Sequence, residues 1–300
     1  MNRHIIAEES RMTRRRLMAD AVCAAGGLAL LSSCAPSGQR KAQAGGFKIG
    51  VCDWTIGKTT NPASLEVAKR IGLDGVQVDF GRGDENLPLF SPELQKRFLD
   101  ARDEHKVEIA SLAMGVLNNI PYKSDPRADR WVRQGIDVAH AMGVRVILLA
   151  FFGNGELRKD KQGIDVVVNR LRRVAPEAQK AGVVLGIESY LSAAEHIDIV
   201  KRVGSPAVQV YYDVANSRNA GYDIFAEIRR LGKLICEFHA KDSDDLYGKG
   251  SMDFPRVRKA MDDIGYRGWF VMEGTKLPLG AEESCRYDAE YLRTIFPPKV

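Results

Sequence analysis

From Phe47 onward, short apolar runs alternate with longer segments of helical periodicity, and this pair recurs eight times. The runs predicted as strands are Lys48–Trp54, Gly75–Phe80, Glu108–Met114, Arg145–Phe151, Val184–Glu188, Gln209–Asp213, Leu234–His239 and Trp269–Glu273. Because these runs are apolar throughout, they are typical of parallel strands that are buried on both faces. Eight strand-helix repeats in about 250 residues predict an α/β fold, a single closed (β/α)₈ barrel rather than an open doubly wound sheet.

The segments between the strands carry the start and stop signals of helices. Asn61, Ser91 and Asp125 each precede a proline, and a polar cap followed by proline is a common helix start. These starts predict helices at Ala63–Ile71, Glu93–Glu104 and Arg127–Met142. Glycines that close predicted helices lie at Gly72, Gly143, Gly182, Gly204, Gly232 and Gly265. The first strand is not followed by the Gly-rich spacing of a dinucleotide-binding loop, and no Walker-type phosphate loop is present.

The first 46 residues have the features of an export signal and a linker. Arg14, Arg15 and Arg16 resemble a twin-arginine motif, and the apolar stretch that follows is too short and interrupted to span a membrane. It ends at Cys34 in a lipobox-like sequence, with ordinary cleavage after Ala44 as the alternative. We therefore expect a signal peptide at 1–33, a flexible tether at 34–46 and the barrel at 47–300. This organisation predicts an exported, periplasmic lipoprotein that meets a membrane only through its lipid anchor or signal.

The charge distribution bears on the partners of the barrel. Four of the five net positive charges lie before residue 47, so the predicted barrel is nearly neutral. A nearly neutral domain lacks the basic surface that nucleic-acid binding requires, and we expect no such partner. The barrel keeps three cysteines, which cannot all pair with one another, and Cys236 lies in an apolar strand as a buried small residue would.

Ionisable residues occupy the same position in the last four repeats. Glu188, Asp213, His239 and Glu273 each end a predicted strand, and they are spaced by 25, 26 and 34 residues, about one repeat each time. In a (β/α)₈ barrel the strand ends meet at one rim, where function resides. Three carboxylates and one imidazole at one rim repel one another unless a cation lies between them, so they predict one divalent metal ion. Mn²⁺ suits this ligand set best, then Mg²⁺ or Co²⁺, with Zn²⁺ as a further candidate. Each residue taken alone could instead be a helix cap or a salt-bridge partner.

Five further side chains are candidate substrate ligands. Lys241 and Asp242 follow His239, and they could bind hydroxyl groups or form only a surface ion pair. Trp54, at the end of the first strand, could stack on the face of a substrate or pack in the core. Asn216 lies three residues after Asp213 and can hydrogen-bond a hydroxyl group. Asp79, which ends the second strand, is a weaker candidate.

Several motifs together resemble a known family. They are Tyr211-Tyr212-Asp213-Val214-Ala215-Asn216, His239-Ala240-Lys241-Asp242, Gly248-Lys249-Gly250-Ser251-Met252-Asp253-Phe254, and Gly265-Tyr266-Arg267-Gly268-Trp269 continuing to Glu273. Over residues 47–296 the chain is similar to the sugar phosphate isomerase/epimerase group of xylose-isomerase-like TIM barrels. The resemblance implies a metal site at Glu188, Asp213, His239 and Glu273, in which the two glutamates are also the catalytic acid/base pair. Ketose 3-epimerases of this group carry a histidine where this chain has Asn216, which cannot carry a proton near neutral pH.

These observations predict an isomerase or epimerase that acts on a sugar or sugar derivative. It would remove the proton α to a carbonyl and pass through an enediolate that the metal stabilises. The first alternative is a metal-dependent lyase or dehydratase on an oxidised sugar or glycoside, because elimination begins with the same proton transfer. A non-catalytic carbohydrate-binding barrel is less favoured, since both glutamates are present. A related DNA endonuclease is disfavoured by the single histidine at the rim. The expected partner is a small carbohydrate, and the oligomeric state is left open, a homo-oligomer included.

Overall fold

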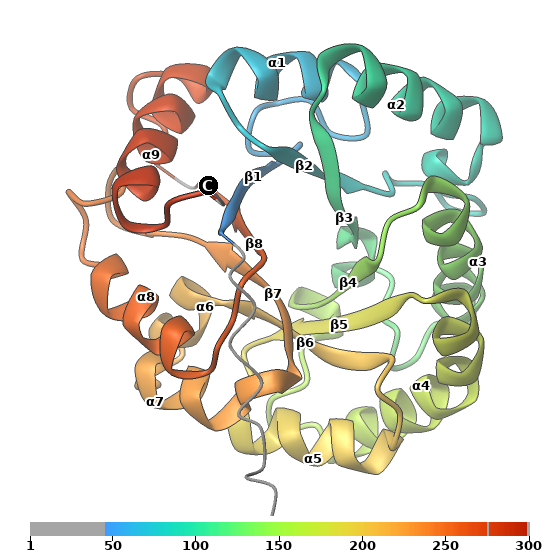
Figure 1. Ribbon diagram of the computed structural model, residues 1–300. Helices are drawn as coiled ribbons and strands as arrows, with labels where there is room; N and C mark the ends of the chain where they lie inside the picture. The colour runs from blue at the N-terminus through green and yellow to red at the C-terminus, as the bar shows by residue number, and fades with distance from the viewer. Residues whose placement is uncertain (1–45, 275, 299–300) are drawn as a thin grey trace, which may run out of the picture. The chain divides into compact units, whose positions relative to one another are not determined.

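Eight parallel strands form a closed barrel, and helices surround it on the outside (Figure 1). The computed structural model describes residues 46–274 and 276–298. The strands are β1 (Lys48–Cys52), β2 (Gly75–Asp79), β3 (Glu108–Met114), β4 (Val146–Phe151), β5 (Val184–Ser189), β6 (Val208–Asp213), β7 (Ile235–Ala240) and β8 (Trp269–Met272). They pair in sequence order, and β1 pairs with β8 to close the ring. The predicted (β/α)₈ barrel is confirmed.

The helices alternate with the strands. They are α1 (Ala63–Ile71), α2 (Pro92–His105), α3 (Pro126–Met142), α4 (Lys161–Ala181), α5 (Ala193–Val203), α6 (Val214–Asn219), α7 (Ile224–Leu231), α8 (Phe254–Asp263) and α9 (Ala281–Ile295). Single 3₁₀ turns lie at η1 (Pro88–Phe90), η2 (Gly115–Asn118), η3 (Gly153–Gly155) and η4 (Gly232–Leu234). The Ser91 and Asp125 side chains cap α2 and α3, whereas at α1 the N-cap position is Pro62 itself. No helix of the described residues is long and apolar enough to cross a membrane.

Five strand ends differ from the prediction by one or two residues, and two of these differences change how the site is built. β1 ends at Cys52 because the chain turns there, with the Thr55 amide donating to the Cys52 carbonyl at 3.0 Å. Trp54 therefore lies in the turn after β1 and not on the strand. β8 ends at Met272, so Glu273 is the first residue beyond it, held by a hydrogen bond from its amide to the Ala240 carbonyl at 2.9 Å.

The core has two parts, one on each face of the barrel wall. A large apolar layer lies between the strands and the helices, and a smaller group that includes Leu148, Ala150 and Tyr211 fills the barrel interior. Trp269 closes the end of the barrel away from the rim. A Cβ atom on Gly75 would lie 2.5 Å from the Trp269 ring, so the ring fits there because residue 75 has no side chain.

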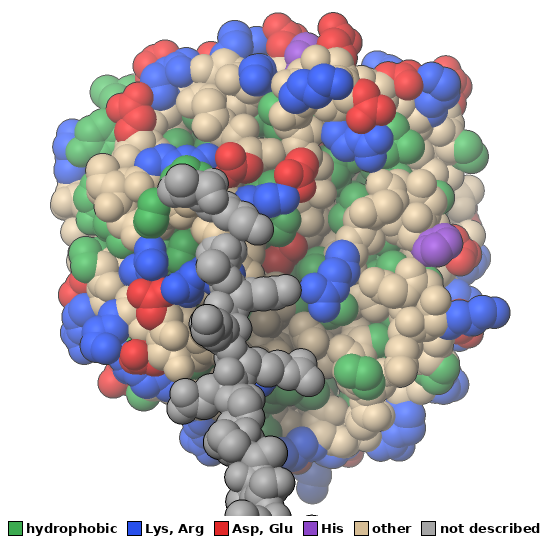
Figure 2. Space-filling model, viewed as in Figure 1, with side chains coloured by type: hydrophobic (Ala, Val, Ile, Leu, Met, Phe, Trp, Pro, Cys, Tyr) green, Lys and Arg blue, Asp and Glu red, His purple; other side chains and the backbone are tan. Residues whose placement is uncertain are grey.

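The remaining expectations concern cysteines, surface charge and the N-terminal segment. Cys52, Cys236 and Cys285 are free thiols, which agrees with the prediction that they do not all pair, and Cys236 is partly buried in β7. On the face in Figure 2, acidic and basic side chains are interspersed over the surface. The predicted signal at 1–33 and the tether, except Gly46, lie outside the described residues.

Candidate metal centre and active site

The four ionisable residues of the last repeats meet at one point of the rim. Glu188 lies on β5, Asp213 ends β6, His239 lies on β7 and Glu273 follows β8. Each offers a ligand atom, and these atoms all lie within 4.8 Å of one another. Asp213 is also the register partner of His239 in the β6–β7 pair. Strand-end position and barrel closure together bring these four side chains to one place.

The two carboxylate oxygens of Asp213 have different roles: one stabilises a helix, and the other faces the site. Its Oδ1 accepts hydrogen bonds from the Ala215 and Asn216 amides, at 2.8 and 2.7 Å, and so caps α6. Its Oδ2 is buried and accepts no hydrogen bond from any described residue, with the Lys241 Nζ atom 3.6 Å away. The cap orients the carboxylate, and the second oxygen stays available for a cation.

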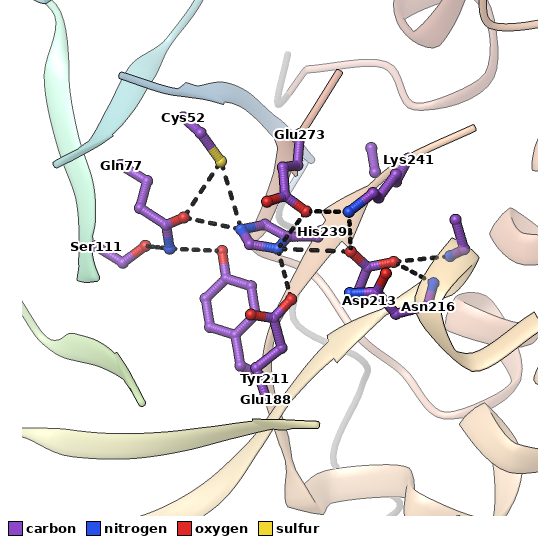
Figure 3. Close-up of polar contacts among 12 residues, drawn as sticks. Cys52, Gln77, Ser111, Glu188, Tyr211, Asp213, Asn216, His239, Lys241 and Glu273 are labelled. Carbon is purple, nitrogen blue, oxygen red and sulfur yellow. Dashed lines mark hydrogen bonds and ion pairs between the residues drawn. The ribbon is translucent and has the colours of Figure 1, made fainter. Parts of the chain in front are cut away.

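His239 is held from both sides of its ring. Its Nε2 atom lies 2.8 Å from Gln77 Oε1, an oxygen that can only accept, so Nε2 carries a proton and donates it. Its Nδ1 atom then faces the carboxylates, 2.9 Å from Glu188 Oε1 and 3.7 Å from Glu273 Oε2. Figure 3 shows the two glutamates approaching the histidine from opposite sides. The ring therefore presents Nδ1 to the same point as the three carboxylates.

Two groups outside the set of four hold Glu273. The Lys241 ammonium lies 2.7 Å from Glu273 Oε2, and Trp54 Nε1 donates to Glu273 Oε1 at 3.2 Å. Lys241 is 13% exposed at its side chain, so its ion pair is inside the site and is not a surface pair. Both residues line the cavity over the site, as does Asn216.

The electrostatics of the cluster reflect burial and crowding of like charge. Burial raises the pKa of Asp213 above its ordinary value, and the Glu273 and Glu188 charges add to the rise. Burial would also raise the pKa of Glu273, but the Lys241 and His239 charges outweigh it and lower that pKa. Burial works against the charged form of His239, yet the neighbouring carboxylates raise its pKa to about 9. Positive charge at this point is therefore strongly favoured.

The donor set fits a divalent metal ion. Three carboxylates and one imidazole are hard to intermediate ligands, which suit Mn²⁺, Mg²⁺, Co²⁺ or Zn²⁺. The Asp213 Oδ2 atom without a hydrogen bond is the clearest sign, because burying an unsatisfied carboxylate oxygen is costly unless a cation or donor faces it. The ligand set does not distinguish among these ions.

Asp242 is placed differently from the prediction. It is fully buried and does not line the cavity. Its Oδ2 accepts from the Met252 amide at 2.9 Å, and its Oδ1 accepts from the Asp244 amide at 3.1 Å. These bonds hold the loop between β7 and α8, so its position indicates a structural role and corrects the expectation of a substrate ligand.

A hydrogen-bonded layer beneath the site was not anticipated from the sequence. Gln77 donates from Nε2 to Ser111 Oγ at 2.9 Å and to the Tyr211 hydroxyl at 3.1 Å, and Cys52 Sγ lies 3.3 Å from Gln77 Oε1 (Figure 3). These bonds fix the amide that positions His239. The alternation along β2 places Gln77 on the same inward face as Asp79, and this was the signal that could have revealed it.

Residues 65–295 match the family described as xylose isomerase-like TIM barrel. The chain belongs to this family. It is 27% identical over 177 residues to a 2-epi-5-epi-valiolone 7-phosphate 2-epimerase of Actinoplanes sp., which covers 59% of this chain and 65% of the relative. It is 24% identical over 233 residues to the L-ribulose-5-phosphate 3-epimerase UlaE of Escherichia coli, covering 70% of this chain and 80% of the relative.

Solved structures share the fold of this family member. A D-psicose 3-epimerase from Clostridium cellulolyticum H10 superposes with a TM-score of 0.70 at 18% identity, covering 83% of this chain and 99% of that chain. The 3-keto-D-glucoside 4-epimerase YcjR from E. coli gives 0.70 at 16% identity, with the same 83% and 99% coverage. At these identities the likeness establishes the common barrel.

Proposed function

We propose that the protein is a metal-dependent epimerase or isomerase of a sugar or sugar derivative. The observation that carries the proposal is the placement of Glu188 and Glu273 on opposite sides of His239 within one cluster of ligand atoms. Epimerisation needs one base on each face of the carbon that loses its proton, and two opposed carboxylates meet that need. The sugar epimerases among the relatives support the same reaction class.

The residues of the chain would divide the work as follows. One glutamate takes the proton α to the substrate carbonyl, and the other returns a proton to the opposite face or to the neighbouring carbon. Return to the opposite face gives an epimer, and return to the neighbouring carbon gives an aldose–ketose isomer. Lys241 and Trp54 hold Glu273 in position through the bonds described above. The side-chain amide of Asn216 has no hydrogen-bond partner among the described residues, and it can donate to a sugar hydroxyl in the cavity.

A divalent ion would be held by Glu188, Asp213, His239 and Glu273, and it would supply positive charge that stabilises the enediolate. Before the ion binds, Lys241 and His239 supply the positive charge nearest to these carboxylates. The pKa of Lys241 is raised above its ordinary value: burial alone would lower it, but the Asp213 and Glu273 carboxylates outweigh that cost. Lys241 therefore stays charged, ready to interact with an oxygen of the substrate.

The direct test is incubation of the metal-loaded protein with a panel of ketoses in D₂O, followed by NMR. Deuterium at the carbon next to the carbonyl together with an epimer or isomer is the expected result. Deuterium without either product would shift the assignment to the lyase alternative. Absence of deuterium from every substrate, with metal bound, would contradict the proposal.

Export to the periplasm is a separate proposal and rests on the N-terminal sequence alone. Phosphorylated sugars are chiefly intracellular, so an exported enzyme would meet free, oxidised or glycosidically linked sugars. Labelling of cells with a lipid precursor, comparing the wild type with Cys34→Ala, tests the anchor. Label in the wild type that is lost in the variant supports lipidation, and an unlabelled wild type contradicts it.

A further inference from the structure

The cavity over the metal centre is larger than one sugar ring requires. Its volume is about 610 Å³, within the range of roughly 300–1,000 Å³ that is typical of pockets for drug-sized ligands, which are larger than a single sugar ring. The four ligand residues lie on the β5–β8 side, and the cavity extends over the ends of β3 and β4 to Gly115, Asn118 and Phe152. A monosaccharide bound at the centre would leave the part of the cavity over β3 and β4 to solvent.

Two aromatic rings line this extension. Phe152 follows β4, Tyr190 follows β5, and their ring centroids are 4.7 Å apart at an interplanar angle of 70°. Tyr190 is the first residue after β5 and two residues beyond Glu188, so it lies on the outer side of the ligand, towards the mouth of the cavity. The Arg158 guanidinium lies 4.6 Å from the Tyr190 centroid and fixes the ring from another side.

The polar groups of the extension suit hydroxyls better than a phosphate. The Asn118 Oδ1 atom accepts from the Phe152 amide at 2.9 Å, and this orients the side chain while its NH₂ group has no partner among the described residues. Of the described residues that line the cavity, only Arg82 and Lys241 are cationic, and Lys241 is paired with Glu273. Asp79 adds a negative charge to the same region. Phosphate sites typically gather several cationic or backbone donors, and an aromatic and amide surface is typical of neutral ligands.

We propose that the extension is a subsite for a second, uncharged ring, so that the substrate is a keto-glycoside or glycosyl-ketose rather than a sugar phosphate. This inference rests on the proposed function, because it assumes that the reacting ring lies at the metal centre. The second ring packs against Phe152 and Tyr190, and Asn118 donates to one of its hydroxyls. Tyr190 is here a binding residue and takes no part in proton transfer.

The experiment compares fructose, fructose 6-phosphate and a panel of glucosyl-fructoses on the full-length, metal-loaded protein. Affinity is measured by calorimetry and proton exchange by NMR in D₂O. We expect at least one glucosyl-fructose to bind about tenfold more tightly than fructose, as expected for one aromatic contact. Tyr190→Ala should abolish this advantage and leave fructose binding within about twofold, whereas Tyr190→Phe should keep it.

Several outcomes would overturn the subsite. They are equal affinity for fructose and every glucosyl-fructose, tighter binding of fructose 6-phosphate than of any glucosyl-fructose, or an equal loss for all ligands in Tyr190→Ala. Exchange of fructose protons under those outcomes would leave the proposed function standing. Failure of exchange with every ligand, while a glucosyl-fructose still binds through Tyr190, would instead remove the proposed function and keep the subsite.

Discussion

The two halves of the barrel rim carry different chemistry on the same scaffold. From β5 to β8, each strand end supplies an ionisable side chain that points to a common centre. From β1 to β4, the residues at or just beyond the strand ends that line the cavity include Trp54, Asp79, Gly115 and Phe152, and of these four only Asp79 is charged. Because the strands of both halves belong to the same barrel, side-chain identity and not the fold confines the ionisable cluster to one half.

Asp79 and Asp213 show how this difference arises. Both are buried carboxylates at strand ends. Asp79 accepts backbone hydrogen bonds at both oxygens, from Gly81 at 2.7 Å and Gly115 at 3.2 Å, whereas Asp213 uses one oxygen for a cap. A Cβ atom on Gly115 would lie 2.7 Å from Asp79 Oδ2, so the glycine permits this close approach. Burial raises the pKa of Asp79 to about 6, but both of its carboxylate oxygens already accept hydrogen bonds from backbone amides.

The largest contrast is expected between Glu273→Gln and Asp79→Asn. Glu273→Gln removes a proton carrier and should lower the rate of substrate proton exchange by about 10²–10⁴-fold, while the circular dichroism spectrum stays unchanged. Asp79→Asn changes the other half and should cost no more than about tenfold, since it transfers no proton. Comparable losses in the rate of proton exchange in both variants would contradict the claim that the two halves of the rim differ in their chemistry.

Lys241→Gln should separate metal binding from turnover. The substitution removes a positive charge 3.6 Å from Asp213 Oδ2 and 2.7 Å from Glu273 Oε2. A competing cation is lost, so the apparent metal affinity should stay equal or rise, while proton exchange falls by about 10²-fold as an electrostatic stabiliser is lost. Calorimetric titration with Mn²⁺ measures the first effect. A weaker metal site in this variant would assign Lys241 to the support of the ligands instead.

Gln77 belongs to the β1–β4 half by sequence but serves the other half, and Gln77→Leu should expose this link. Loss of the acceptor at 2.8 Å leaves His239 Nε2 unsatisfied and its ring unfixed. Partners of a ligating histidine contribute about 10–100-fold to metal affinity. Gln77→Glu keeps an acceptor and is the matched control, for which we expect most of the affinity to remain. Identical metal affinity in wild type and Gln77→Leu would show that the bond does not position the ring.

The smallest effect on the metal centre is expected from His196, a histidine of the β5–β8 half that lies outside the cluster. It is buried, with Nε2 2.9 Å from Ser189 Oγ and Nδ1 3.1 Å from the Ser192 carbonyl, and burial lowers its pKa to about 4. Since the unfolded pKa is about 6.5, its contribution to stability is complete above that pH and is lost as the pH falls towards 4, up to about 3 kcal/mol.

Urea unfolding of wild type and His196→Gln between pH 4 and 7.5 measures this contribution. The variant should lose less stability than the wild type over that range, with metal affinity at pH 7.5 unchanged. Parallel pH profiles for the two proteins would contradict the assignment, and a change in metal affinity would connect His196 to the centre.

The sequence predicts one part of this rim better than the other. The four ligand positions could be predicted because each ends a predicted strand and they recur at intervals of about one strand-helix repeat. Both patterns are visible in the sequence. Gln77 and Tyr190 were missed because an amide inside a strand and an aromatic after one become functional only through partners far away in sequence. The role of Asp242 was predicted wrongly for the same reason. Its carboxylate accepts a hydrogen bond from the Met252 amide, ten residues later, and therefore faces the loop. The local sequence pattern predicts where along its strand a residue lies, whereas long-range packing determines which groups its side chain contacts.

The central claim is that Glu188, Asp213, His239 and Glu273 bind one divalent ion on which proton transfer depends. It is tested most directly by stripping the protein with a chelator and titrating Mn²⁺ back while deuterium incorporation into a ketose substrate is followed. Exchange should be at background without metal and rise to a plateau at one ion per chain, and Asp213→Asn should shift the plateau to higher metal concentration. Exchange that is equally fast in the stripped protein, or that does not saturate at one equivalent, would contradict the account.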